Sequence, residues 1–498
     1  MGQDVQPERN AIREHMIIDG KPVSDSQGPT IPVYDPATGQ VIAHQPEAGT
    51  QGVDLAVRAA RQALEQGEWG KMLPAQRERL LLRLADLVEA NADELARLET
   101  LNNGKLLFFS YGLEVAASAQ WLRYMAGWAT KISGELLSPS IAFPPGINYH
   151  AYTRQEPVGV VGAIVPWNFP LLMAVWKIAP AMAAGCTVVL KPAEETPLTA
   201  IRLAELALEA GFPAGVINVI TGRGESTGAA LTAHPDVNKI SFTGSTEVGK
   251  LIGHQAINDM KRMSLELGGK SPVVIMDDCD VDMAIQGAAN AIFFNQGQVC
   301  TAGSRLFVQK GIYERVVQGV ADLASSMTLG SGFEQSTQIA PLISARHQQR
   351  VQNYIEAGRK QGGRMLAGEG ARPEQGYFVR PTVFADVAPD ARIMREEIFG
   401  PVVVATPFDT EAQALALAND TDFGLGASVW SQDLARVQRL TAGIKAGTVW
   451  VNTHNMLDPS MPFGGYKQSG LGREHGRAAV EAYLETKSVC MAYPAALY

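Results

Sequence analysis

One cysteine stands where a thiol could take part in catalysis. Cys300 ends the motif NQGQVC (295–300), a polar bend with a glycine that follows an apolar segment of helical character. A thiol at such a bend can face a cleft, and its thiolate would be a nucleophile. A free cysteine is more often buried and inert. The bend alone leaves both interpretations open.

A carboxylate occupies a comparable position at the end of an apolar strand. The motif ELGGK (266–270) places Glu266 at the strand end, with two glycines close behind it. Glycines there would let a carboxylate and a cofactor ring share a small space, because they lack side chains. A solvated strand end is the alternative interpretation.

Two glycine-containing turns each follow an apolar strand and could receive a phosphate. The first, Thr221 to Gly228, approximates the dinucleotide pattern GxGxxG, but its last spacing is one residue too long. The second, Phe242 to Gly249, joins a strand to a helix whose first N–H groups and dipole attract a pyrophosphate. We favour the second turn, although both could be tight turns that simply need glycine.

Alternating strands and helices must position these motifs. Four apolar runs predict strands of a parallel sheet covered on both faces: 158–165, 187–190, 216–220 and 239–242. Crossover helices are expected at 197–210 and 246–258. A second series follows Gly268, with strands at 272–276 and 305–308 and helices at 281–294 and from Tyr313. The fold class is therefore α/β, with a doubly wound sheet and a second α/β domain.

Three other segments have periodic patterns. Residues 74–100 repeat leucine and valine at helical spacing, which predicts one long amphipathic helix. Residues 30–41 are predicted to form a strand and a turn, and 483–493 an edge strand.

One apolar window is long enough to cross a bilayer. Leu171 to Leu190 spans twenty mostly apolar residues. Lys177, Pro180 and Gly185 interrupt it. A buried helix that runs into a buried strand explains these interruptions better than a membrane span does.

Composition restricts the class of protein further. The chain has 498 residues, 46% of them hydrophobic, so two or three substructures are expected. A net charge of -9 without clustered Lys and Arg argues against a nucleic-acid partner. Four scattered cysteines without zinc-type spacing predict no metal site and a reducing, intracellular setting. Met1 to Asn10 is polar and fits no targeting peptide, which predicts a cytoplasmic protein without a membrane partner.

The chain resembles the aldehyde dehydrogenase family. Besides ELGGK and GQVC (297–300), the motifs that carry the resemblance, in family order and spacing, are PWNFP (166–170), KPAE (191–194), FTGS (242–245), EIFGP (397–401) and PFGG (462–465). The resemblance runs from about Tyr34 to Val489. It implies a Rossmann-type NAD-binding domain (1–134 and 155–267), an α/β catalytic domain (268–480) and a small β oligomerisation arm (135–154 and 481–498) that forms homodimers or homotetramers.

The resemblance also assigns catalytic roles. Cys300 would attack an aldehyde to form a thiohemiacetal and then a thioester. The Asn168 side chain and the Cys300 backbone N–H would stabilise the oxyanion. Glu266 would be the general base for hydrolysis. Lys177 and Glu474 would form a proton relay, for which a surface or structural ion pair is the alternative.

The implied cofactor is NAD. Lys191 and Glu194 would bind the adenosine ribose, Gly244 and Ser245 the pyrophosphate, and Glu397 with Phe399 the nicotinamide riboside. The remaining predicted contacts are Ile164, Pro166, Trp167, Asn168, Gly224, Gly228, Phe242, Val248, Leu267 and Gly268. A carboxylate such as Glu194 would repel a 2'-phosphate, so NAD is preferred over NADP, whose weaker use Lys191 would still permit.

The implied substrate is a small, uncharged aldehyde. The predicted tunnel residues are mostly apolar or aromatic: Phe169, Met173, Trp176, Phe294, Val299, Thr301, Leu457 and Phe463. Segments 69–106, 152–157 and 455–459 resemble family members that oxidise phenylacetaldehyde in aromatic-amine and styrene breakdown. A broad-specificity enzyme and an inactive scaffold are the alternatives, and the joint presence of Cys300, Glu266 and Asn168 argues against the scaffold. Asp458 could form an exposed turn or reach the tunnel mouth.

Overall fold

The apolar runs of the first half of the chain form the core of one large sheet. In the computed structural model, which describes residues 12–24 and 28–494, its eight strands lie in the order β19-β11-β10-β7-β8-β9-β1-β2. The five central strands are parallel: β7 (Val160–Ile164), β8 (Thr187–Lys191), β9 (Ile217–Val219), β10 (Lys239–Thr243) and β11 (Arg262–Glu266). Strand order reverses between β7 and β10, so the predicted doubly wound sheet is confirmed. The Met1 to Asn10 segment lies outside the described residues.

Short antiparallel strands complete this sheet at both edges. They are β1 (Met16–Ile18), β2 (Lys21–Val23) and β19 (Gly470–Leu471). Residues 470–471 thus pair with β11 although they come late in the chain, inside the range predicted to form the second domain. Two-residue strands carry too little pattern to be recognised in a sequence.

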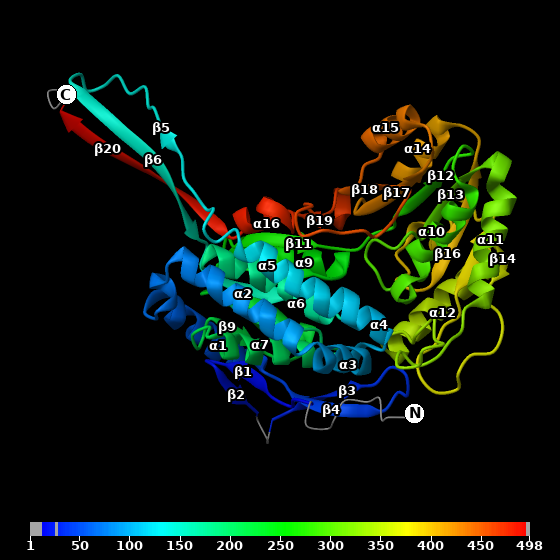
Figure 1. Cartoon of the computed structure of the whole chain (residues 1–498), viewed down its shortest axis with the longest axis horizontal. Helices are drawn as coiled ribbons and strands as arrows, with labels where there is room; N and C mark the ends of the chain where they lie inside the picture. Colours follow the sequence, from blue (N-terminus) through cyan, green and yellow to red (C-terminus); the bar gives the residue numbers. More distant parts are fainter. Residues whose placement is uncertain (1–11, 25–27, 495–498) are drawn as a thin grey trace.

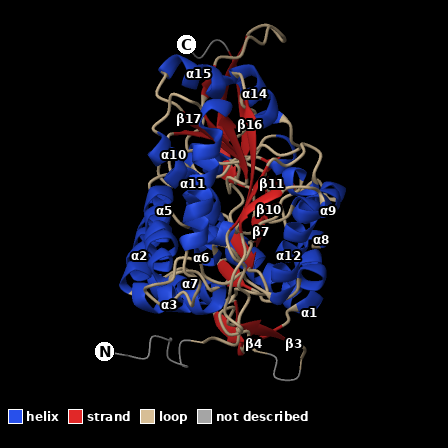
Figure 2. Cartoon of the chain, turned by 90° about the vertical axis from the view of Figure 1, so that its right-hand side faces the viewer, coloured by secondary structure: helices blue, strands red, loops and turns tan. Residues whose placement is uncertain are grey.

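Helices cover both faces of the sheet (Figure 2). Val161 and Ala163 of β7 pack in one core with α2 (Pro74–Ala90), α5 (Ala117–Ala126), α6 (Pro170–Ala184) and α7 (Leu198–Ala210). Val160 and Ile164 belong to the opposite core, with α1 (Gly49–Glu65), α8 (Ala229–Ala233) and α9 (Thr246–Asn258). Because alternate residues of a strand point to opposite faces, burial on both sides explains the unbroken apolar runs.

A second sheet of seven strands forms the other lobe of the molecule (Figure 1). Its order is β14 (Arg364–Ala367), β15 (Thr382–Ala385), β16 (Val402–Phe408), β13 (Arg305–Gln309), β12 (Pro272–Ile275), β17 (Gly426–Trp430) and β18 (Thr448–Val451). Only β14 is antiparallel to its neighbour among these described strands. The helices of this lobe include α10 (Val281–Phe293), α11 (Tyr313–Ser326), α12 (Ala345–Lys360), α14 (Glu411–Asn419) and α15 (Leu434–Gly443). The predicted second α/β unit is confirmed.

A three-stranded antiparallel sheet projects from the body as an arm (Figure 1). Strand β6 (Ile147–Pro157) pairs along its whole length with β20 (Leu484–Pro494), and the short β5 (Leu136–Leu137) pairs on its other side. The predicted strand near 483–493 is therefore confirmed, and it lies at the edge of this sheet. A separate hairpin of β3 (Thr30–Tyr34) and β4 (Val41–Pro46) confirms the strand and turn predicted at 30–41.

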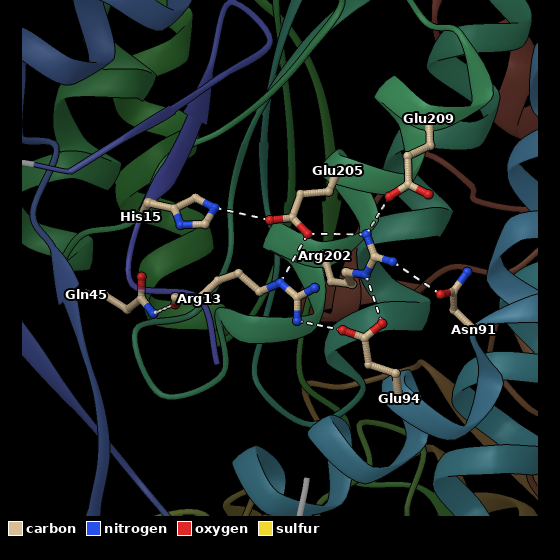
Figure 3. A network of polar contacts seen from close by, with 8 residues as sticks. All are labelled: Arg13, His15, Gln45, Asn91, Glu94, Arg202, Glu205 and Glu209. Carbon is tan, nitrogen blue, oxygen red and sulfur yellow. Dashed lines mark hydrogen bonds and ion pairs between the residues drawn. The ribbon is translucent and has the colours of Figure 1, made fainter. Parts of the chain in front are cut away.

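The single long helix predicted over 74–100 is wrong. Helix α2 ends at Ala90, and α3 (Ala92–Asn103) begins after Asn91, whose φ of -102° and ψ of 24° are not helical. The Asn91 amide donates to the Leu87 carbonyl at 2.7 Å, and its oxygen accepts from Arg202 of α7 at 3.2 Å. Figure 3 shows this arginine among Glu94, Glu205 and Glu209. A tertiary polar network thus holds the break, which helical spacing could not reveal.

The apolar window from Leu171 to Leu190 consists of most of α6 followed by β8, as expected. Every residue of α6 is buried, and Pro180 lies inside the helix. Across residues 12–24 and 28–494, no helix is long and apolar enough to cross a membrane.

Candidate active site

A cavity of about 870 Å³ lies in the crevice between the two large sheets. The first sheet contributes residues that follow β7 and β10 and the end of β11, and the second lobe contributes 299–301 and 395–399. In doubly wound sheets, ligands bind outside the carboxyl ends of the strands, where the strand order reverses. Here that point lies between β7 and β10.

Cys300 reaches this cavity through an unusual bend. Asn295, Gln296 and Gly297 have consecutive left-handed φ angles of 47°, 57° and 69°. A Cβ on Gly297 would lie 2.2 Å from the Gly400 carbonyl oxygen, so the bend requires glycine there. Burial, with the Glu397 and Glu266 carboxylates nearby, raises the pKa of the Cys300 thiol to about 12. The thiol is therefore protonated in this state, and a base or a positive charge must generate the thiolate.

Asn168 lies in the loop between β7 and α6 and is 4% exposed. Its side-chain amide donates one hydrogen bond, to the Gln298 carbonyl at 2.9 Å, which ties it to the loop before Cys300. An amide group has two hydrogens, so a second one remains to donate toward an oxygen in the cavity. The site thus has a donor close to its nucleophile.

Glu266 ends β11 as a buried carboxylate that lines the cavity. Neither of its oxygens has a hydrogen-bond partner within the described chain. Burial, together with the neighbouring Glu474, raises its pKa well above the ordinary carboxyl range. A carboxylate with these properties can take a proton at neutral pH.

Lys177 and Glu474 form a buried ion pair beside Glu266. Lys177 lies in the middle of α6 with no exposed side-chain surface, and its ammonium contacts Glu474 Oε1. The Glu474 backbone pairs with Phe463, exchanging two hydrogen bonds of 2.7 Å. The structure thus brings both residues together, and the pair is not on the surface. Their relay role stays a prediction.

Nine of the predicted cofactor residues line the cavity: Pro166, Trp167, Asn168, Gly244, Ser245, Leu267, Gly268, Glu397 and Phe399. Ser245 caps α9 by accepting from the Val248 N–H at 3.3 Å, so the free N–H groups of the helix start face this space. A Cβ on Gly268 would lie 2.3 Å from Glu397 Oε2. Burial raises the pKa of Glu397 to about 7, and its other oxygen accepts from the Gly269 N–H at 2.9 Å. Of the two glycine turns, the one at 242–249 opens onto the cavity.

The other seven predicted cofactor residues do not line this cavity: Ile164, Lys191, Glu194, Gly224, Gly228, Phe242 and Val248. Lys191 and Glu194 lie 3.6 Å apart at the end of β8, and a Cβ on Gly228 would lie 3.6 Å from Lys191 Cε. These residues form a second group, beside the first glycine turn. The Phe242 ring lies against Gly244, where a Cβ would approach it to 2.5 Å, so Phe242 supports the second turn from inside the sheet.

All eight predicted substrate residues line the cavity. Phe169 and Phe294 stack at 6.1 Å between ring centroids, and Trp176 and Phe463 meet edge to face at 5.6 Å. Asp458 does not line the cavity, and its carboxylate accepts from the Ser460 N–H at 2.9 Å. The structure therefore places Asp458 in a half-buried turn outside the cavity lining.

Several cavity residues escaped the sequence analysis. Trp121 of α5 stacks on Trp176 at 5.9 Å with an interplanar angle of 21°. His347 of α12 bonds the Phe399 carbonyl at 2.7 Å, and burial lowers the pKa of His347 to about 4, so the neutral ring donates this bond. The apolar face of 113–121 was the one available signal for Trp121. Nothing local pointed to His347.

The fold and the site together define an aldehyde dehydrogenase. The chain belongs to the aldehyde dehydrogenase family, whose model matches residues 23–489. A phenylacetaldehyde dehydrogenase from Pseudomonas fluorescens is 56% identical over 97% of this chain and 96% of its own. The mitochondrial aldehyde dehydrogenase of Homo sapiens is 46% identical over 93% of this chain and 89% of its own. An aldehyde dehydrogenase from Bacillus cereus, solved as an NAD+ complex, is 48% identical with a TM-score of 0.93, covering 96% of each chain.

Replacing Asn168 by alanine is expected to lower kcat about a hundredfold, because one oxyanion donor is lost. Steady-state and stopped-flow formation of NADH would measure the effect. An Asn148→Ala variant in the arm is a suitable control, since Asn148 of β6 lies outside the cavity lining. An unchanged kcat for the Asn168 variant would contradict the oxyanion role.

Proposed function

We propose that this enzyme oxidises phenylacetaldehyde and related aromatic aldehydes to their acids, with NAD as cofactor. The observation that carries the proposal is the convergence of Cys300, Asn168 and Glu266 on one cavity with aromatic walls. The joint presence of these three groups argues against an inactive scaffold. The similar enzyme from Pseudomonas fluorescens, named for phenylacetaldehyde, supports the choice of substrate.

The side chains divide the chemistry between them. The Cys300 thiolate attacks the aldehyde carbon, and the oxyanion of the thiohemiacetal accepts hydrogen bonds from the Asn168 side-chain amide and the Cys300 backbone N–H. NAD, when bound, supplies the acceptor for the hydride that leaves this carbon. Glu266 then takes a proton from the water that hydrolyses the Cys300 thioester. The Lys177–Glu474 pair passes that proton away from Glu266.

NAD fits the residues that surround the cavity and the group at the end of β8. The start of α9 offers N–H groups to a pyrophosphate, and the absence of a side chain at Gly268 lets the Glu397 carboxylate lie close to it in the cavity. Glu194 would accept hydrogen bonds from ribose hydroxyls and repel a 2'-phosphate. NADP is therefore the weaker cofactor, and the neighbouring Lys191 allows it some use.

Aromatic walls favour an aromatic substrate. The rings of Phe169, Phe294, Trp176 and Phe463 can contact a phenyl group by stacking or edge to face. A cavity of this size also admits aliphatic aldehydes, so a broad-specificity enzyme is the second candidate. A single methylene changes selectivity by only about 1 to 3 kcal/mol.

The arm suits self-association. Leu136 and Leu137 of β5 are exposed, at 73% and 38%, on a strand with a free edge. We infer that the chain consists of an NAD-binding domain (1–134 and 155–267), a catalytic domain (268–480) and this arm (135–154 and 481–498). The arm would build homodimers or homotetramers. Scattered cysteines are consistent with a cytoplasmic enzyme of aromatic catabolism, with styrene breakdown as one such route.

Steady-state kinetics over a panel of aldehydes test the proposal. The panel contains phenylacetaldehyde, benzaldehyde, hexanal and betaine aldehyde, each with NAD and with NADP. We expect the highest kcat/KM for phenylacetaldehyde with NAD and a very low value for betaine aldehyde. Equal kcat/KM for hexanal would favour the broad-specificity enzyme, and higher kcat/KM with NADP would contradict the role of Glu194.

A further inference from the structure

Three charged side chains lie buried behind the catalytic loop and have no part in the chemistry above. Glu99 of α3, Lys105 and Glu114 are at most 1% exposed. The Lys105 ammonium contacts Glu114 Oε1 and lies 3.9 Å from Glu99. Groups of this kind are rarely buried unless they are paired. Lys105 and Glu114 also form hydrogen bonds to backbone groups near the active site.

Lys105 bonds directly to the backbone of the oxyanion-binding residue. Its Nζ donates to the Asn168 carbonyl at 2.8 Å, and the same carbonyl accepts from the Asn295 amide at 3.2 Å. The ammonium also lies 4.4 Å from the centroid of the Phe169 ring. Lys105 therefore contacts the two consecutive residues that supply the oxyanion donor and one wall of the cavity.

Glu114 fixes the helix that follows these residues. Its Oε2 accepts from the Leu172 N–H at 2.9 Å, in the first turn of α6. Phe169, the N-cap residue of α6, has no side-chain group that could accept a hydrogen bond from the first turn. The Glu114 carboxylate, which comes from another segment, takes the place of this cap. The Glu114 carboxylate thus links Lys105 to the first turn of α6. Asn168 is fixed by Lys105 at its own carbonyl and by Glu114 through the helix that follows it.

Burial, with the Glu114 carboxylate nearby, raises the pKa of Glu99 well above its usual range. Burial also raises the pKa of Glu114, and the Lys105 ammonium opposes that shift. Lys105 contacts Glu114 more closely than Glu99, so Lys105 and Glu114 form the main ion pair of the cluster. Replacing such a buried pair by apolar residues of similar volume often leaves stability unchanged, so stability alone gives little reason for the pair.

We propose that Lys105 and Glu114 are positioning residues for Asn168, which they hold where its amide can reach the oxyanion. The proposal rests on the oxyanion role given to Asn168 above. It assigns the pair an effect on steps that form a tetrahedral oxyanion, and no effect on other reactions of the Cys300 thiol.

Two variants and a matched control test the proposal. Lys105→Met and Glu114→Gln should lower kcat for aldehyde oxidation about 10- to 100-fold, because a small displacement of a catalytic group has effects of this size. The KM for NAD should change little. Arg202→Met removes a cation from another cluster of carboxylates (Figure 3), outside the cavity lining, and should lower Tm without lowering kcat.

Three further readouts separate positioning from general damage. Hydrolysis of p-nitrophenyl acetate, which forms an oxyanion at Cys300, should fall in parallel with kcat, whereas alkylation of Cys300 by iodoacetamide should keep its rate. In an Asn168→Ala background, Lys105→Met should cause little further loss, since both act through one donor. Lys105→Met leaves the buried Glu114 carboxylate without its cation and should lower Tm. A Lys105→Met/Glu114→Leu variant should have a higher Tm than Lys105→Met but the same low kcat.

Contrary results would be clear. Unchanged kcat in folded Lys105→Met and Glu114→Gln variants, equal losses of alkylation and ester hydrolysis, or additive losses with Asn168→Ala would each overturn the proposal. A fully active Asn168→Ala variant would instead contradict the oxyanion role itself, which the Lys105 and Glu114 variants alone do not test.

Discussion

Replacing Cys300 by alanine is expected to lower dehydrogenase activity by about four orders of magnitude or more, the scale at which enzymes lose activity without their nucleophile. No other thiol is available to substitute for it, because Cys300 is the one cysteine that lines the cavity among the residues described. NADH formation at saturating aldehyde would measure the loss. Binding of NAD, followed by tryptophan fluorescence, should persist.

Cys279 provides the matched control. It is half-buried just after β12, away from the cavity lining, and burial raises the pKa of its thiol to about 11. A Cys279→Ala variant should keep its activity. Mass spectrometry of acid-quenched enzyme should find the acyl adduct on Cys300, and an adduct on another residue would refute the nucleophile assigned here.

Replacing Glu266 by glutamine is expected to stop the reaction after one turnover. Thiol attack and hydride loss need no proton transfer to Glu266 once the thiolate exists, whereas hydrolysis of the thioester needs a base. The variant should therefore release a burst of NADH close to one per site and then turn over about 10²- to 10⁴-fold more slowly than the parent. Rapid mixing with absorbance detection would resolve the two phases.

The pH dependence of the parent enzyme checks the same assignment. Because burial raises the pKa of Glu266, its proton leaves only well above the ordinary carboxyl value of about 4.3. The hydrolysis rate should rise with pH through that raised pKa, and this limb should be missing from the slow phase of the Glu266→Gln variant. A variant with neither a burst nor a slow phase would place Glu266 at an earlier step.

Much of the site could be predicted because parallel strands bring distant motifs together. Asn168 follows β7, Gly244 follows β10 and Glu266 ends β11, so one edge of one sheet collects all three. Cys300 comes from the other lobe, where it follows α10. The eight tunnel residues came from the family resemblance, and the cavity contains every one of them.

Other features depend on contacts between residues far apart in the chain. Arg202 holds Asn91, where α2 ends, although the leucine spacing continues through the break. Trp121 reaches the cavity because α5 packs on α6, which orients one face of an ordinary amphipathic helix. Helical periodicity marks the apolar face that carries Trp121, but it does not show what that face contacts, and it does not mark the break at Asn91.

By itself, the sequence determined the order of the main strands and helices around the site and the motifs at their ends, because burial on two faces leaves apolar runs and tight turns leave glycines. Only the tertiary structure decided which ionisable groups are buried and which of them lie next to one another. Burial accounts for the protonated Cys300 thiol, for the Lys105–Glu114 pair behind Asn168, and for the raised pKa of Glu266, which has no hydrogen-bond partner among the described residues. The free energy of a charge depends on every neighbouring group and on the water excluded, and these are set only when the chain has folded.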